Sequence, residues 1–337
     1  YDILSPKTTI HIFAIFDNTI LRMKTNYLPH FLWISCLVVG IYAVLQGCNG
    51  LGETPTSGEF RLVTDETLLP IAEAEVQIFD HTYTNAHTQL SAKPEAQVIA
   101  DLMNKEAAIA LLTRDLNEAE KKKLLERAIY PRITPIAIDA LALIVNPQNP
   151  INHLSYQQVT DILEGKTTTW QQLGKGNGKI NLVFDHAGSS TVRGVTDLIG
   201  GKKLPDNAYA MKTNNEVLAY IAKNPNGLGI TTLSWLSDNV NDTTKLLYDK
   251  ISVLSLGAKN AVQDTAYYQP SQEYLLDSLY PLSRPVYLIS REAKAGTATG
   301  FSAFVASDRG QRIILTAGLV PVVMPTREII IKKGNLQ

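Results

Sequence analysis

The stretch Leu182-Val183-Phe184-Asp185-His186-Ala187-Gly188-Ser189-Ser190-Thr191-Val192-Arg193 joins an apolar segment to a segment with helical periodicity. The apolar part predicts a buried strand, and the apolar residues that follow share one helical face: Val192, Val195, Leu198 and Ile199. Three consecutive hydroxyl side chains therefore lie where the strand turns into the helix. At such a turn, unpaired backbone N–H groups and the positive end of the helix dipole can bind an anion. We therefore expect an anion-binding turn, with Arg193 as a candidate cation.

The same alternation of strand and helix continues on both sides of this stretch. Apolar strand-like segments are expected near residues 60–63, 107–112, 133–145, 227–230 and 287–289. Helical segments are expected near residues 69–79, 96–102, 117–127, 155–165, 217–221, 301–305 and 311–316. Strands that alternate with helices of this length predict an α/β fold with mainly parallel sheets.

Composition and charge restrict the class of partner. The chain has 337 residues, of which 45% are hydrophobic and 19% are charged, and its formal net charge is −1. These proportions are typical of a globular protein of about two domains. Surfaces that bind nucleic acid are strongly basic, so this charge argues against a nucleic-acid partner. Any affinity for an anion must come from a local site.

The N-terminal region has the pattern of a targeting segment. Met23 and Lys24 begin a short polar region, an apolar run covers residues 31–45, and Leu45-Gln46-Gly47-Cys48 ends it. An apolar run this short, followed by small residues, favours a signal peptide over a membrane-spanning helix. We therefore expect a signal peptide over 23–47, upstream translated sequence over 1–22, and a linker over 48–58. The alternative is a buried apolar helix with a chance cysteine.

The ending of this segment resembles a bacterial lipobox, which implies cleavage before Cys48 and lipidation of its thiol. The chain has two cysteines, Cys36 inside the signal segment and Cys48 at the lipid site, so no disulfide is expected in the mature domain. The histidines after the signal segment have no metal-ligand spacing: His81, His87, His153 and His186. We expect no metal and no cofactor.

Five groups of residues form an ordered series along the chain. They are Ile144-Val145-Asn146-Pro147-Gln148-Asn149-Pro150, Leu154-Ser155, Ile162-Leu163-Glu164-Gly165-Lys166 with Trp170, Tyr280-Pro281-Leu282-Ser283-Arg284-Pro285-Val286-Tyr287, and Ser307-Asp308-Arg309-Gly310-Gln311 with Gly318-Leu319-Val320-Pro321. This series resembles the periplasmic phosphate-binding proteins of ABC transporters and covers nearly all of residues 59–325. Each motif alone is weak, whereas the ordered series is specific.

The resemblance implies a type II periplasmic-binding-protein fold, in which two α/β lobes joined by two crossover segments close on a ligand. We expect the crossovers near Ile136–Ala140 and Arg284–Val286. One lobe would then comprise residues 59–136 with 286–337, and the other residues 137–285.

The resemblance also implies a function without catalysis. The chain is expected to bind inorganic phosphate, or a close tetrahedral oxyanion, and to deliver it to an ABC permease. It is expected to be monomeric and periplasmic, attached to the membrane only through its lipid anchor.

The site residues of the family are matched unevenly. Its Ser-Gly-Thr turn matches Ser189-Ser190-Thr191, with serine in place of glycine, and its preceding arginine is replaced by Asp185. The first-lobe helix start matches Thr64-Asp65-Glu66-Thr67, where the family usually has small residues, and its Ser-Asp or Ser-Arg turn matches Thr113-Arg114. These matches imply that the ligand is held by Asp65, Glu66, Thr67, Arg114, Asp185, Ser189, Ser190, Thr191 and Arg193. A carboxylate among Asp65, Glu66 and Asp185 could accept the hydrogen of a protonated phosphate, which sulfate lacks.

Other interpretations of these residues stay open. The hydroxyls at 189–191 could form an ordinary helix N-cap, and Asp185 could accept backbone N–H bonds within its own turn. Arg114 could form a surface ion pair with Asp115 or Glu118, and Arg193 could be solvated.

Two other classes of protein remain. A sensing or surface-interaction lipoprotein would share this fold without taking part in transport. A phosphoester hydrolase could use the same turn to hold substrate, but the sequence has no Gly-x-Ser-x-Gly motif and no evident base beside Ser189.

Overall fold

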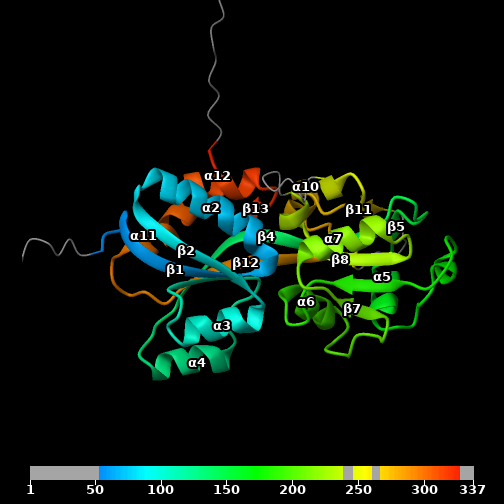
Figure 1. Ribbon diagram of the computed structural model, residues 1–337, viewed down its shortest axis with the longest axis horizontal. Helices are drawn as coiled ribbons and strands as arrows, with labels where there is room; N and C mark the ends of the chain where they lie inside the picture. Colours follow the sequence, from blue (N-terminus) through cyan, green and yellow to red (C-terminus); the bar gives the residue numbers. More distant parts are fainter. Residues whose placement is uncertain (1–52, 238–245, 260–265, 327–337) are drawn as a thin grey trace, which may run out of the picture. The chain divides into compact units, whose positions relative to one another are not determined.

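The computed structural model describes residues 53–237, 246–259 and 266–326 (Figure 1). The expected upstream sequence 1–22, the signal peptide 23–47 and the lipidation site Cys48 lie outside the described residues, as does the start of the linker 48–58. The described part of that linker forms a bridge between Thr54 and Ser57 at the start of the first strand.

The N-terminal half of the described chain is built on three parallel strands. Strand β1 (Ser57–Asp65) lies between β2 (Asn85–Lys93) and β3 (Ile109–Leu112). Alternate side chains of β1 enter different cores: Phe60 and Leu62 pack in one cluster, and Val63 packs in another. Strand β2 was not predicted from the sequence, because its residues are mostly polar, and only Ala86 is fully buried.

Helices cover both faces of these strands. The cluster around Phe60 is completed by α2 (Leu69–Thr82), α11 (Thr297–Ala306) and α12 (Asp308–Thr316). The cluster around Val63 is completed by α3 (Glu95–Met103) and α4 (Glu118–Glu126). We call β1–β3 with these five helices the first lobe.

A second set of parallel strands forms the other half of the sheet. Strand β6 (Asn181–Phe184) lies between β7 (Ala208–Ala210) and β8 (Gly227–Thr232). Helices α5 (Tyr156–Leu163) and α6 (Ser190–Leu198) cover one face, and α7 (Asn214–Lys223) covers the other. We call β6–β8 with these helices the second lobe.

The remaining short elements are η1 (Glu66–Leu68), η2 (Trp170–Leu173), α8 (Leu233–Leu236), α10 (Gln272–Leu276), β5 (His153–Leu154), β9 (Ser252–Val253), β10 (Ser255–Gly257), β11 (Tyr267–Tyr268) and β13 (Val320–Pro321). Of these, β11, β10 and β5 form a separate small sheet.

Two long strands connect the lobes, as Figure 1 shows in the middle of the view. Strand β4 (Arg132–Val145) pairs with β12 (Ser283–Ser290) along residues 132–140 and with β8 along residues 141–145. Both pairings are antiparallel, and the β4–β12 register shifts between Val286 and Tyr287. The predicted α/β class is therefore confirmed. The prediction of parallel strands holds within each lobe, whereas the strands shared by the lobes are antiparallel.

A candidate oxyanion site where the two lobes meet

The first-lobe part of the site is the turn at the end of β1. Asp65 is the last residue of that strand, and its Oδ1 accepts a hydrogen bond from the backbone N–H of Thr67 at 3.0 Å. The Thr67 hydroxyl donates to the same oxygen. Aspartate is a favoured residue at a helix start because its short carboxylate reaches the free N–H groups there. Both side chains are fully buried.

The second-lobe part is the turn between β6 and α6. The Ser189 hydroxyl accepts from the backbone N–H of Val192 at 3.3 Å, so Ser189 is the N-cap of α6. The same hydroxyl donates to Asp185 Oδ1 at 2.5 Å, and the Thr191 hydroxyl donates to Asp185 Oδ2 at 3.4 Å. Ser189 and Thr191 therefore both bond to Asp185 within the second lobe.

Ser190 is the residue of this turn that reaches the first lobe. It is the first residue of α6, and its backbone N–H donates to Asp65 Oδ2 at 3.3 Å. Its hydroxyl donates to Asp65 Oδ1 at 2.8 Å. The Asp65 carboxylate thus lies at the N-terminus of α6, where free N–H groups and the helix dipole favour negative charge.

Arg284 is the cation behind these hydroxyls, and from the sequence it was expected only as part of a family motif and of a crossover. It lies on β12 and donates to Ser190 Oγ at 3.0 Å and to Thr67 Oγ1 at 2.9 Å. It also donates twice to Asp139 Oδ2, at 3.0 and 2.7 Å, from the facing position on β4. An arginine just before the apolar part of a strand was the available signal, because buried arginines require acidic or hydroxyl partners.

A second acidic side chain of the first lobe contacts the start of α7. The Glu66 carboxylate accepts from the backbone N–H of Asn214 at 3.3 Å and from its Nδ2 at 2.5 Å. Asn214 Nδ2 also donates to Asp185 Oδ2 at 3.3 Å. Two consecutive first-lobe carboxylates, Asp65 and Glu66, therefore contact the first residues of two second-lobe helices. The sequence analysis named both acids but not Asn214.

Burial changes the protonation of two of these acids. Burial raises the pKa of Asp185 to about 7, and the hydrogen bond from Ser189 only partly offsets it. Burial likewise raises the pKa of Glu66 to about 7, against the lowering effect of the hydrogen bonds from Asn214. Both groups therefore titrate near neutral pH.

The two arginines expected at the site, Arg114 and Arg193, both bond to Glu95, and we call this group of residues the rim. Glu95 Oε1 accepts from Arg114 Nε at 3.0 Å and from Arg193 Nε at 2.9 Å. Arg193 also donates to Thr113 Oγ1 at 2.8 Å, and Arg114 forms two bonds with Glu120. The rim thus joins the lobes through Arg193, about which the sequence analysis left two interpretations open. Arg114 forms ion pairs with Glu95 and Glu120, whereas the alternative to a ligand role was an ion pair with Asp115 or Glu118.

Two further hydrogen bonds link the lobes beside η1. The Thr232 hydroxyl donates to the backbone carbonyl of Thr67 at 3.2 Å. Trp235 Nε1 donates to the backbone carbonyl of Glu66 at 3.1 Å. Neither residue was predicted, because an ordinary buried threonine or tryptophan has the same sequence pattern.

Within the ranges that the structure describes, no group of three or more His, Cys, Asp or Glu side chains could hold a metal ion. Over those same ranges, no helix has the length and apolar character needed to cross a membrane.

Two α/β lobes that share two strands, with polar donors converging where the lobes meet, define a class of protein: the binding proteins whose lobes close on a small solute. Residues 49–309 match the family model of the PBP superfamily domain. The chain therefore belongs to the PBP superfamily, the periplasmic-binding-protein family.

Named relatives and a solved structure agree with this family and with the type II fold. The phosphate-binding protein PstS of Borreliella burgdorferi is 22% identical over 76% of this chain and 87% of its own length. The phosphate-binding protein PstS of Pseudomonas aeruginosa is 22% identical over 83% of this chain and 88% of its own length. A Clostridium perfringens structure, described as a phosphate ABC transporter substrate-binding protein with bound phosphate, is 23% identical. It covers 79% of this chain and 100% of its own, with a TM-score of 0.67. By name, the first two relatives are phosphate-binding proteins and the third is a substrate-binding protein.

Proposed function

We propose that this chain binds inorganic phosphate, or a close tetrahedral oxyanion, between its lobes and delivers it to an ABC permease without chemical change. The observation that carries this proposal is the convergence of Ser190, Thr67 and Arg284 where the lobes meet. Hydroxyl and backbone donors with a guanidinium behind them are the groups that bind an oxyanion. The names of the relatives support phosphate as the ligand.

The residues divide into four groups under this proposal. Ser190, Thr67 and Arg284 hold the oxyanion. Glu66 and Asp185, which titrate near neutral pH, are the candidates to accept or donate the proton of the phosphate. Ser189 and Thr191 position Asp185, while Arg114 and Arg193 act through the rim.

The organisation of the protein follows from the same proposal. Residues 59–136 with 286–337 form one lobe and residues 137–285 the other, and the lobes close by bending at the shared strands. The chain acts as a monomer outside the cytoplasmic membrane, anchored by a lipid on Cys48.

Titration calorimetry of the purified protein with phosphate, sulfate, molybdate and a phosphonate tests the proposal. We expect saturable binding of phosphate and a much weaker response to sulfate, which has no hydrogen to offer an acidic side chain. Absence of binding by all four anions up to millimolar concentrations, both in the natural protein and in variants without the Asp65 carboxylate, with circular dichroism showing that each is folded, would contradict the proposal.

A variant with a matched control tests the location of the site. Ser190→Ala with Thr67→Val removes two donors and should weaken phosphate binding by roughly tenfold or more. Ser307→Ala removes the N-cap of α12, in the first lobe, and should leave the affinity unchanged. Unchanged affinity in the double variant would move the site elsewhere.

A further inference from the structure

The donors of the candidate site are already directed at one anion, the carboxylate of Asp65. A hydroxyl has one hydrogen to donate. Arg284 donates to the hydroxyl oxygens of Ser190 and Thr67, so each of these hydroxyls can give its single hydrogen to Asp65 Oδ1. The backbone N–H of Ser190 is directed at the other carboxylate oxygen.

We propose that the Asp65 carboxylate is an internal ligand of the oxyanion site, which phosphate must displace before it can bind. The inference rests on the proposed function, because the donors that bond to Asp65 are the donors proposed to hold phosphate. It goes further by assigning to Asp65 the control of affinity and of lobe closure.

The geometry of Asp65 supports this assignment. Its two oxygens bond to the N–H and the hydroxyl of one helix-terminal residue, as two oxygens of a phosphate would. The contact joins residues 125 positions apart in the chain, on different lobes. Asp65 therefore links the lobes through the groups that a bound oxyanion would link.

The charges of the site make displacement necessary. Asp65, Glu66 and Asp185 are mutually close enough that the charges of the other two raise the pKa of Asp185. In a buried site, an added anion beside an ionised carboxylate is strongly repelled. Phosphate and the Asp65 carboxylate therefore compete for the same donors.

Competition within the chain reduces the apparent affinity for an external ligand. The apparent dissociation constant for phosphate equals the intrinsic constant divided by the fraction of molecules in which Asp65 does not occupy the donors. If Asp65 occupies the donors in about nine molecules out of ten, phosphate binds about tenfold more weakly than to the free site. A residue that instead accepts the proton of bound phosphate has the opposite effect, because its removal weakens binding.

Asp65→Ser is the variant that separates these effects. Serine retains an N-cap oxygen for η1, but it is too short to reach the second lobe. We expect phosphate to bind this variant roughly tenfold or more tightly than it binds the natural protein. Asp65→Asn, which keeps the size and removes the charge, should fall between the two.

The control matches the change in charge. Asp308→Ser also removes one first-lobe carboxylate, but from the exposed start of α12. It should leave phosphate affinity unchanged. Tighter binding by Asp65→Ser, whether or not the natural protein binds measurably, supports the internal ligand, while equal or weaker binding overturns it. Absence of binding by the natural protein and by both Asp65 variants overturns the proposed function instead.

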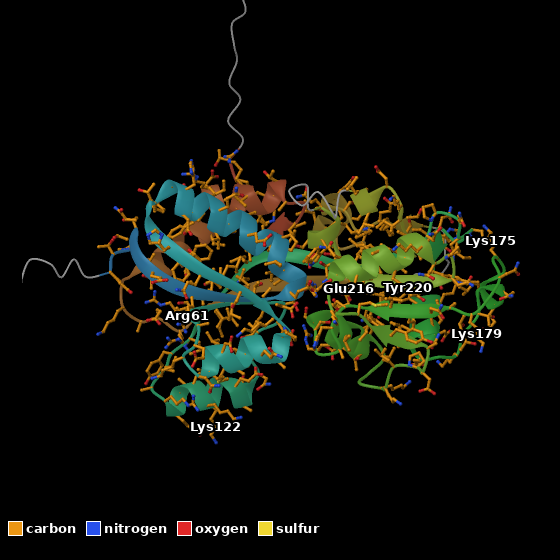
Figure 2. All side chains as sticks on the ribbon, viewed as in Figure 1. Arg61, Lys122, Lys175, Lys179, Glu216 and Tyr220 are labelled. Atoms are coloured by element: carbon orange, nitrogen blue, oxygen red, sulfur yellow. The ribbon has the colours of Figure 1, made fainter. Side chains whose placement is uncertain are left out.

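Lobe closure provides a second readout. Figure 2 shows Lys122 on the first lobe and Lys175 on the second, at distant positions, and both are exposed. Fluorescent labels at Lys122→Cys and Lys175→Cys, with Cys36 and Cys48 replaced by serine, report the separation of the lobes. Without phosphate, we expect high energy transfer with Asp65 present and low transfer with Asp65→Ser, which phosphate then raises. Equal transfer in the two proteins without phosphate would contradict a closing role for Asp65.

Discussion

The turns that follow β1 and β6 each place a fully buried aspartate at the end of a strand and hydroxyl side chains just after it. In the second lobe, Asp185 bonds to Ser189 and Thr191 of its own turn. In the first lobe, Asp65 bonds within its own turn and also reaches Ser190 of the other lobe. Similar turns thus give one carboxylate that organises a lobe and one that joins two lobes.

The difference depends on the groups that face each carboxylate. Asp65 accepts from two hydroxyls, and Arg284 donates to both of them. The carboxylate of Asp65 is therefore linked to a cation through one hydroxyl on each path. Asp185 faces Glu66 across the Asn214 amide, so its charge has an acidic neighbour. The local sequence thus places an acid at each strand end, while the groups that face it from the other lobe determine which bonds that acid forms.

The largest effect on stability is expected when Arg284, the cation behind Asp65, is removed. Arg284→Met leaves Asp139 buried without its partner, and we expect the free energy of unfolding to fall by about 3–5 kcal/mol. Urea unfolding measures this loss. Arg284→Met combined with Asp139→Leu should recover most of it, because no unpaired charge remains. A loss below about 1 kcal/mol in the single variant would show that Arg284 does not support the site.

The next largest effect is on the pH dependence of the unfolding free energy, and it comes from the raised pKa of Asp185. In the folded protein its pKa is about 7, above the ordinary value of 3.8. The folded state therefore binds the proton more tightly than the unfolded state does. The resulting stability is present below pH 4 and is lost as the pH rises to about 7, which amounts to roughly 4 kcal/mol. In Asp185→Asn we expect a flatter dependence of unfolding free energy on pH, whatever the absolute stability.

Asp206→Asn, at an exposed carboxyl of the same lobe, is the control for this profile and should leave its slope unchanged. If unfolding free energy depends on pH in Asp185→Asn as steeply as in the natural protein, the pKa of Asp185 is not raised by folding.

The smallest effect is expected at the rim. Arg193→Gln removes a partly exposed ion pair with Glu95, which keeps its bond to Arg114. We expect a loss of about 0.5 kcal/mol in unfolding free energy, reduced further at high salt, and little change in phosphate affinity. A fall in affinity of more than about tenfold would instead make Arg193 a ligand cation, as one interpretation of the sequence holds.

The elements of the fold were largely predictable because their apolar periodicity is local. The strands at 60–63, 107–112 and 133–145 and the helix after Ser189 all appear in the structure near the expected residues. Strand β2 was missed because its alternation is mostly polar, and its pairing with β1 is decided by tertiary contacts.

The site was predictable only in part, because its assembly depends on contacts between distant residues. The turns at Asp65 and Ser190 were identified from strand-to-helix patterns that each segment carries. The positions of Arg284 and Asn214 were not, since their role follows from pairing across the sheet and between the lobes. The internal contact between Asp65 and Ser190 could not be read from either turn alone.

The position of β12 in the sheet has a consequence for how the chain folds. This strand lies between β3 and β4, so the edge of β3 stays unpaired until residues 283–290 are available. About 170 residues separate Leu112 from Ser283, and contacts over such distances form slowly because the intervening loop must first close. The second lobe, continuous in sequence between β4 and β12, can therefore fold first. In pulse-labelling hydrogen exchange, the amides of β6 and β8 should become protected before those of β1 and β3.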